Sequence, residues 1–136
     1  MKWMWSTLVV YASVFNSLAL AQDQVVDRTA QGQPATDIRV GIYVNVQLDC
    51  TSGPLPSIRL SSAPAHGKVT VKKAKINGTN LRQCLALEVP GYVAFYKSQV
   101  DFIGSDVFVL EVKFPSGKTE VQRFTVTVAS HSGRDI

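Results

Sequence analysis

An alternation of apolar and polar side chains on both sides of one turn is the feature that most constrains how this chain can fold. Period two is the repeat of a β-strand with one buried and one solvated face. The turn residues Pro115-Ser116-Gly117-Lys118 separate two such runs. The sequence therefore predicts a long two-stranded hairpin near the C-terminal end. Its apolar side consists of Phe108, Leu110, Val112, Phe114, Phe124, Val126 and Val128.

The longest alternating run lies earlier in the chain, from Asp37 to Cys50. Strict alternation with β-branched residues on one side predicts a half-buried strand, with Cys50 on the apolar face and Tyr43 on the polar face. The run exceeds the usual strand length of about 5–6 residues. Gly41 within it predicts a bulge or a change of sheet.

Shorter alternating segments separated by turn residues fill most of the remaining chain. No segment after the N-terminal apolar run has a helical period. The sequence therefore predicts an all-β fold, an antiparallel β-sandwich of about seven strands that spans residues 37–129. Further strands are expected at 57–61, 68–72, 85–89 and 92–96, and turns at 51–56, 62–67, 73–82 (around Asn77-Gly78) and Pro90-Gly91.

Residues 1–21 have the layout of a cleavable secretory signal peptide. A basic residue comes first, positions 8–15 are mostly apolar, and Ala19-Leu20-Ala21 is a small-x-small cleavage site. A membrane anchor is the alternative, but the apolar run is shorter than the roughly 20 residues that cross a bilayer. The expected location is therefore periplasmic or secreted.

The mature chain is expected to begin and end with polar segments. Residues 22–36 contain Gly32 and Pro34 among polar side chains and are predicted to form a flexible N-terminal arm. Residues 130–136 are predicted to be a polar tail. The sequence predicts no transmembrane segment in the mature chain, because no second long apolar run follows the first.

Two cysteines, Cys50 and Cys84, are present in the chain. In an exported protein such a pair predicts a disulfide, and two buried free thiols are the alternative. A bridge would close a loop of about 35 residues and contribute roughly 4 kcal/mol in the chain-entropy description. The cysteines lack the spacing of metal ligands, so the sequence predicts no metal site and no cofactor.

Four motifs between Ile58 and Val128 follow one another in a set order. They are the segments 64–69 (PAHGKV), 91–96 (GYVAFY), 102–108 (FIGSDVF) and 126–128 (VTV). In this order they resemble the bacterial immunoglobulin-like and cadherin-like domains of exported proteins. The resemblance implies an immunoglobulin-like β-sandwich. Such domains serve as spacers, adhesins and assembly modules, so the resemblance does not select one function.

Within this resemblance, Gly104 and Asp106 form a structural corner before the penultimate strand. Glycine permits a tight turn with positive φ, and a short carboxylate accepts backbone N–H bonds that hold such a turn. A cadherin-type calcium site needs more oxygen ligands than Asp101 and Asp106 supply. The predicted role of the corner is therefore structural.

No catalytic motif is present in the sequence. It contains no Gly-x-Ser-x-Gly elbow, no HExxH and no Gly-rich phosphate loop. His66 and His131 are the only side chains whose ordinary pKa lies near neutrality, and both are expected to be exposed. The protein is predicted not to be an enzyme, and a hydrolase with a dispersed site is the remaining catalytic alternative.

The distribution of charge is uneven along the chain. No acidic residue lies between Cys50 and Leu87, whereas several lysines and arginines do. Such a segment can contact an anionic partner, and a solvated face that maintains solubility is the alternative. Nucleic acid is not expected, because no aromatic side chains interleave the lysines. The possible contact patch consists of Lys68, Lys72, Lys73, Lys75 and Arg82.

The sequence therefore predicts a non-enzymatic exported domain that mediates contacts with a protein or with an anionic component of the cell envelope. The contact would use the basic segment or an exposed sheet edge. The alternative from another class is a small-ligand or polysaccharide-binding module. That module would need exposed aromatic side chains, for which Tyr43, Tyr92 and Tyr96 are the candidates.

Overall fold

The computed structural model of the protein describes residues 10–13, 24–81 and 84–130. Most of the predicted signal peptide and tail lies outside these ranges. All regular secondary structure within them is β-strand, which confirms the all-β prediction. The seven strands of the described residues are β1 (Gln24–Gly32), β2 (Ile38–Tyr43), β3 (Ser57–Ser62), β4 (Gly67–Leu81), β5 (Cys84–Ser98), β6 (Gly104–Lys113) and β7 (Thr119–Val128).

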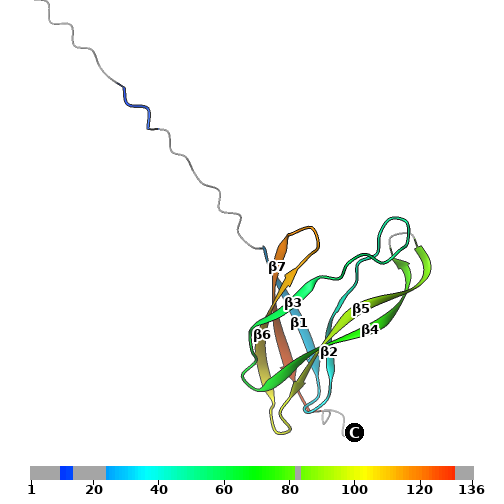
Figure 1. The fold of residues 1–136 in the computed structure, drawn as a ribbon. Coiled ribbons are helices and arrows are strands. Elements are labelled where there is room, and N and C mark those ends of the chain that lie inside the picture. Colours follow the sequence, from blue (N-terminus) through cyan, green and yellow to red (C-terminus); the bar gives the residue numbers. More distant parts are fainter. Residues whose placement is uncertain (1–9, 14–23, 82–83, 131–136) are drawn as a thin grey trace, which may run out of the picture.

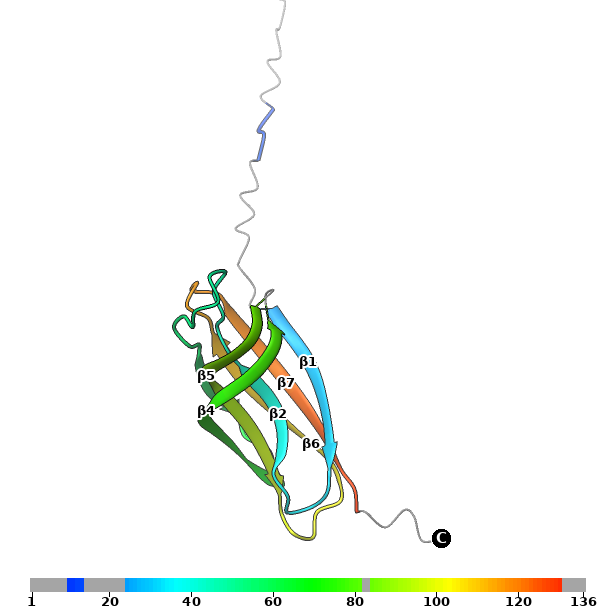
Figure 2. The same cartoon turned by 90° about the vertical axis from the view of Figure 1, so that its right-hand side faces the viewer.

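The strands form two sheets that face each other (Figure 1, Figure 2). One sheet has the order β1-β7-β6-β3 and the other has the order β2-β5-β4. When the strands are lettered A to G along the chain, the sheets contain the neighbours G-F-C and B-E-D. These are the sheet neighbours of an immunoglobulin-like sandwich, so the predicted sandwich architecture is confirmed.

The hairpin of β6 and β7 supplies most of the core between the sheets. The ring of Phe108 is completely buried and stacks on Phe124 at a centroid distance of 4.8 Å and on Tyr96 of β5 at 5.9 Å. Burying one such side chain contributes about 1.5–3 kcal/mol. The packing of β6 against β7 confirms the predicted hairpin. The remaining buried members of this core are Ile38, Tyr43, Ala94, Leu110, Val112, Val126 and Val128.

The prediction of a flexible arm at 22–36 is wrong, because residues Gln24–Gly32 form β1. β1 pairs with β7 in parallel along its whole length, so one strand pair of the sandwich departs from the predicted antiparallel pattern. β1 is an edge strand whose side chains are mostly exposed, which explains its polar composition. Backbone pairing holds it in place, together with an ion pair of 2.7 Å between Asp27 and Arg123.

The predicted strand from Asp37 to Cys50 is shorter in the structure and ends at Tyr43. The pairing register of β2 with β5 shifts between Arg39 and Gly41, so the predicted bulge is present. A bulge places two residues opposite one and reverses the alternation beyond it. Tyr43 is consequently buried in the core at 7% exposure, and its predicted place on the polar face is wrong.

β4 and β5 are much longer than the sequence predicted. The expected loop 73–82 is, up to Leu81, the second half of β4, in which Asn77 pairs with Glu88. The prediction of a turn at Asn77-Gly78 is therefore wrong. The pairing of these two residues with β5 overrides their turn preference.

Pro90-Gly91 also lies inside a strand, although the sequence predicted a turn there. β2 ends its pairing at Tyr43 opposite Tyr92, so β5 has a free edge at the proline, which has no N–H to donate. A Cβ at Gly91 would lie 2.8 Å from the carbonyl oxygen of Tyr43. This glycine therefore permits a close approach of two strands.

The two halves of the β4–β5 ribbon bury opposite faces. In the first half, Val69 and its cross-strand partner Tyr96 pack in the main core. In the second half, Ile76 and its partner Val89 pack in a separate apolar cluster. Val69 and Ile76 are an odd number of positions apart and therefore point to opposite faces. The buried face of the ribbon therefore changes within the segment that was predicted to be a loop.

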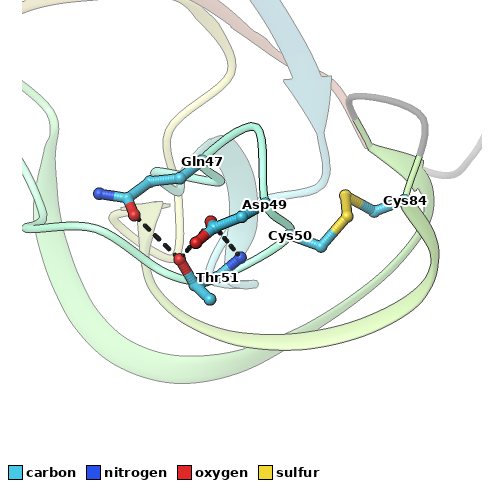
Figure 3. The surroundings of a disulfide bond; sticks show 5 residues. All are labelled: Gln47, Asp49, Cys50, Thr51 and Cys84. Atoms are coloured by element: carbon cyan, nitrogen blue, oxygen red, sulfur yellow. Dashed lines mark hydrogen bonds between the residues drawn. A yellow bond between two sulfur atoms is a disulfide. The ribbon is translucent and has the colours of Figure 1, made fainter.

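The second cluster is closed by the loop between β2 and β3, which a disulfide joins to the ribbon. The Cys50–Cys84 bond confirms the predicted bridge, with a Cα–Cα distance of 5.7 Å (Figure 3). Thr51 Oγ1 donates to Asp49 Oδ1 at 2.6 Å and lies 2.9 Å from Gln47 Oε1, which fixes the loop beside the bridge. Val44 and Val46 complete the cluster from the loop.

Replacing both cysteines, Cys50→Ser with Cys84→Ser, should lower the free energy of unfolding by about 2–4 kcal/mol, since the loop is no longer closed in the unfolded chain. Urea denaturation of the two proteins measures this difference. The wild-type protein with added reductant is the control and should approach the double variant. An unfolding midpoint that neither change moves would contradict a stabilising role for the bridge.

Candidate interaction surface

The predicted corner at Gly104 and Asp106 is a buried hydrogen-bonded junction between the sheets. Asp106 is 3% exposed, and its carboxylate accepts hydrogen bonds from the backbone N–H of Ala65 (3.0 Å), the N–H of His66 (2.9 Å) and the hydroxyl of Tyr96 (2.7 Å). Gly104 has a φ of 140°, where a side chain would be strained. Both carboxylate oxygens of Asp106 are used within the fold, so this junction serves structure.

Burial changes the titration of the two core tyrosines. Burial raises the pKa of Tyr96, and its hydrogen bond to Asp106 raises it further. Burial likewise raises the pKa of Tyr43 to about 12. The Tyr43 hydroxyl donates to Gln122 Oε1 at 2.5 Å, inside the core. These two hydroxyls are therefore structural donors in the folded protein.

Alkaline pH should destabilise the fold through these tyrosines. A pKa raised in the folded state gives stability that is complete below the ordinary tyrosine pKa of about 10 and is lost as pH rises toward about 12. Urea denaturation between these pH values should show a falling free energy of unfolding. The fall should be shallower in Tyr43→Phe, which removes one titrating group, and equal slopes in the two proteins would contradict this account.

The candidates for an aromatic binding platform do not form one. Tyr96 is fully buried and Tyr43 is 7% exposed, while Tyr92 is half-buried and packs against the main core. A glycan platform needs aromatic faces open to solvent, so the structure does not place these tyrosines as the polysaccharide-binding alternative requires.

His66 lies in the loop between β3 and β4. Its ring is exposed and stacks on Phe102 at a centroid distance of 4.3 Å. The described residues contain no group of three or more His, Cys, Asp or Glu side chains that could hold a metal ion. His131 lies outside the described residues, and the hydrolase alternative stays untested.

Four cationic side chains from three strands lie on the outer face of the β2-β5-β4 sheet. Successive side chains of a strand point to opposite faces, and since Tyr96 is buried in the core, its neighbour Lys97 points to solvent. Lys68 pairs directly with Lys97 and points the same way. We call this surface the basic face, and it comprises Arg39, Lys68, Lys72 and Lys97.

The basic face is centred on the half-buried ring of Phe95. Arg39 of β2 is paired opposite Phe95, and the Lys72 ammonium lies 5.7 Å from the ring centroid, within cation–π range. An open depression of about 620 Å³ adjoins the face. Its charged lining consists of Lys68, Lys72, Lys97 and one acid, Asp37.

The cations of the basic face form no ion pair among the described residues. The three ion pairs found there use Arg59, Lys75 and Arg123, each with a carboxylate within 3.5 Å. Lys68 and Lys97 face each other directly, and like charges in such a pair destabilise a sheet. An anion placed between them would relieve this repulsion.

The structure separates the members of the predicted contact patch. Lys68 and Lys72 belong to the basic face. Lys73 lies on the opposite face of β4, as does Lys75, whose ammonium is 3.5 Å from Glu88. Arg82 lies outside the described residues.

Sequence reasoning missed Arg39 and Lys97, because they come from other strands. Arg39 follows Ile38, which the alternation assigns to the apolar face, so the outward direction of Arg39 was predictable. Which lysines of β4 lie near these residues could not be predicted from the sequence, because tertiary structure fixes the pairing of β4 with β5.

Comparisons with protein-family models, with curated proteins and with solved structures found no significant match. Within the described ranges, the structure contains no helix with the length and apolar character needed to cross a bilayer. The disulfide is typical of a domain outside the reducing cytosol.

Proposed function

We propose that this protein is a non-enzymatic exported domain that contacts an anionic component of the cell envelope through its basic face. The observation that carries the proposal is the direct pairing of Lys68 with Lys97 on a face whose cations form no ion pair with any described residue. A sheet that places like charges opposite each other loses stability. An anionic ligand would offset that loss on binding.

The form of the face supports an extended ligand. Rows of side chains on one face of a strand repeat every ~6.6–6.8 Å, and the cations of β4 occur at both ends of such a series, at Lys68 and Lys72. Arg39 adds a charge on the same face from β2, on the other side of β5. A surface with regularly spaced cations suits a partner that carries repeated anionic groups.

Export is the second part of the proposal. Two independent features support it: the signal-like segment at residues 1–21 and the Cys50–Cys84 bridge. A periplasmic or secreted location would give the basic face access to anionic lipids and polymers of the envelope.

Processing should remove residues 1–21. Intact mass spectrometry of the protein recovered from the periplasm or culture medium should show a chain that begins at Gln22 and carries an oxidised cysteine pair. Recovery of the unprocessed chain with both thiols free in the cytosol would contradict export.

Charge reversal on the basic face should weaken anion binding. Lys68→Glu, Lys72→Glu and Lys97→Glu together should weaken binding to a soluble polyanion such as dextran sulfate by at least about 10-fold, and the binding of wild-type protein should weaken with added salt. Fluorescence anisotropy with a labelled polyanion measures both effects.

The matched control changes the same number of lysines elsewhere. Lys73, Lys113 and Lys118 are exposed and lie off the basic face. Replacing these three by glutamate gives the same net charge as the first variant. Equal loss of binding in the two variants would show that net charge, and not the basic face, determines binding, and would overturn the proposal.

A further inference from the structure

Two strongly exposed aliphatic side chains lie at one tip of the molecule. Val100 is 81% exposed and Ile103 is 56% exposed, and both belong to the loop 99–103 between β5 and β6. Figure 2 shows this loop, in yellow, as the far tip of the sandwich, at the end opposite the β6–β7 hairpin. Single exposed aliphatic side chains are common on protein surfaces, but two of them at one tip form an apolar patch that can serve a contact.

The loop is held in this form by the fold. The Phe102 N–H donates to the Gln99 carbonyl at 3.2 Å, and the Gln99 N–H donates to the His66 carbonyl at 2.9 Å. The Phe102 ring packs against the main core and stacks on His66. Gly104, the first residue of β6, has a positive φ. The loop therefore presents Val100 and Ile103 from a fixed backbone.

The basic face lies directly beside this tip. Lys97 is three positions before Val100 on the same chain segment, and Lys68 is its cross-strand partner. Ser98 and Gln99, which lead into the loop, line the same depression as Lys68 and Lys97. The acids at this end are Asp37, Asp101 and the buried Asp106, against four cations on the basic face.

We propose that the loop 99–103 inserts Val100 and Ile103 into the interfacial region of an anionic lipid bilayer, while Lys68 and Lys97 contact the lipid headgroups. This inference rests on the proposed function and names its ligand. Binding to an anionic membrane gains from apolar insertion and from the attraction of nearby lysines to the surface. The apolar side chains and the lysines that supply these two contributions lie next to each other at one end of the protein.

A bilayer fits these observations better than a polysaccharide or a protein. A hydrated polymer offers no apolar phase for Val100 and Ile103. A protein partner would have to match a convex tip with a pocket of its own, whereas lipid adapts to the tip. The alternatives become distinct outcomes of the test.

Vesicle sedimentation tests the inference with phosphatidylcholine vesicles that contain about 30% phosphatidylglycerol and with phosphatidylcholine alone. Wild-type protein should bind the anionic vesicles at least about 10-fold more tightly than the neutral ones. Val100→Ser with Ile103→Ser should weaken anionic vesicle binding about 10-fold and leave binding to dextran sulfate unchanged. The control, Val25→Ser with Leu48→Ser, removes two exposed side chains outside the tip and should bind as the wild type.

A spectroscopic measurement reports insertion directly. Both tryptophans of the chain lie at positions 3 and 5, so Val100→Trp places a single reporter in the processed protein. Its emission should shift to the blue on addition of anionic vesicles, and that of Leu48→Trp should not. The absence of a shift for Val100→Trp would overturn insertion.

The outcomes separate this inference from the proposed function. If the serine variant binds anionic vesicles like the wild type while the Lys68, Lys72 and Lys97 variant does not, the contact is purely electrostatic and insertion is overturned. If wild-type protein binds dextran sulfate but no vesicle, the bilayer is overturned in favour of a polymer or protein partner. If the lysine variant retains all binding, the proposed function itself fails.

Discussion

The hydrogen bonds of the buried Asp106 carboxylate are the interactions on which the structure of the end near the loop 99–103 depends. Asp106 belongs to β6 of one sheet and accepts hydrogen bonds from Tyr96 of the other sheet and from the backbone of Ala65 and His66. A buried charge is tolerated when its acceptor sites are satisfied in this way. The junction fixes the entry to β4, where Lys68 lies, and adjoins the start of β6 where the exposed loop ends. The hydrogen bonds of Asp106 therefore position both the strands at this end and the surface residues that they carry.

Alternation in the sequence predicted the fold where each strand keeps one buried face. The hairpin from Phe108 to Val128 is such a case, because both strands pack across the main core throughout their length. Prediction was wrong where the buried face changes. The bulge after Arg39 turned Tyr43 inward, and the second half of the β4–β5 ribbon buries Ile76 on the opposite face from Val69. β1 was missed because an edge strand held by backbone pairing needs few apolar side chains.

Only two of the four residues of the basic face were predicted from the sequence. Lys68 and Lys72 were predicted as members of a charged segment, but alternation separates them from Lys73. Their true neighbours, Arg39 and Lys97, are distant in the sequence and meet them only through strand pairing. Linear charge density therefore indicated a basic region, while the sheet register decides which charges act together.

Amide hydrogen exchange with and without anionic vesicles tests most directly whether this end of the sandwich is the contact surface. Membrane contact should slow exchange in the loop 99–103 and along the free edge of β4 between residues 67 and 72. The loops 44–56 and 114–118, at the opposite end, should exchange at unchanged rates. Slowing confined to those two loops, with the loop 99–103 unaffected, would contradict the assignment of function to the basic face and its neighbouring tip.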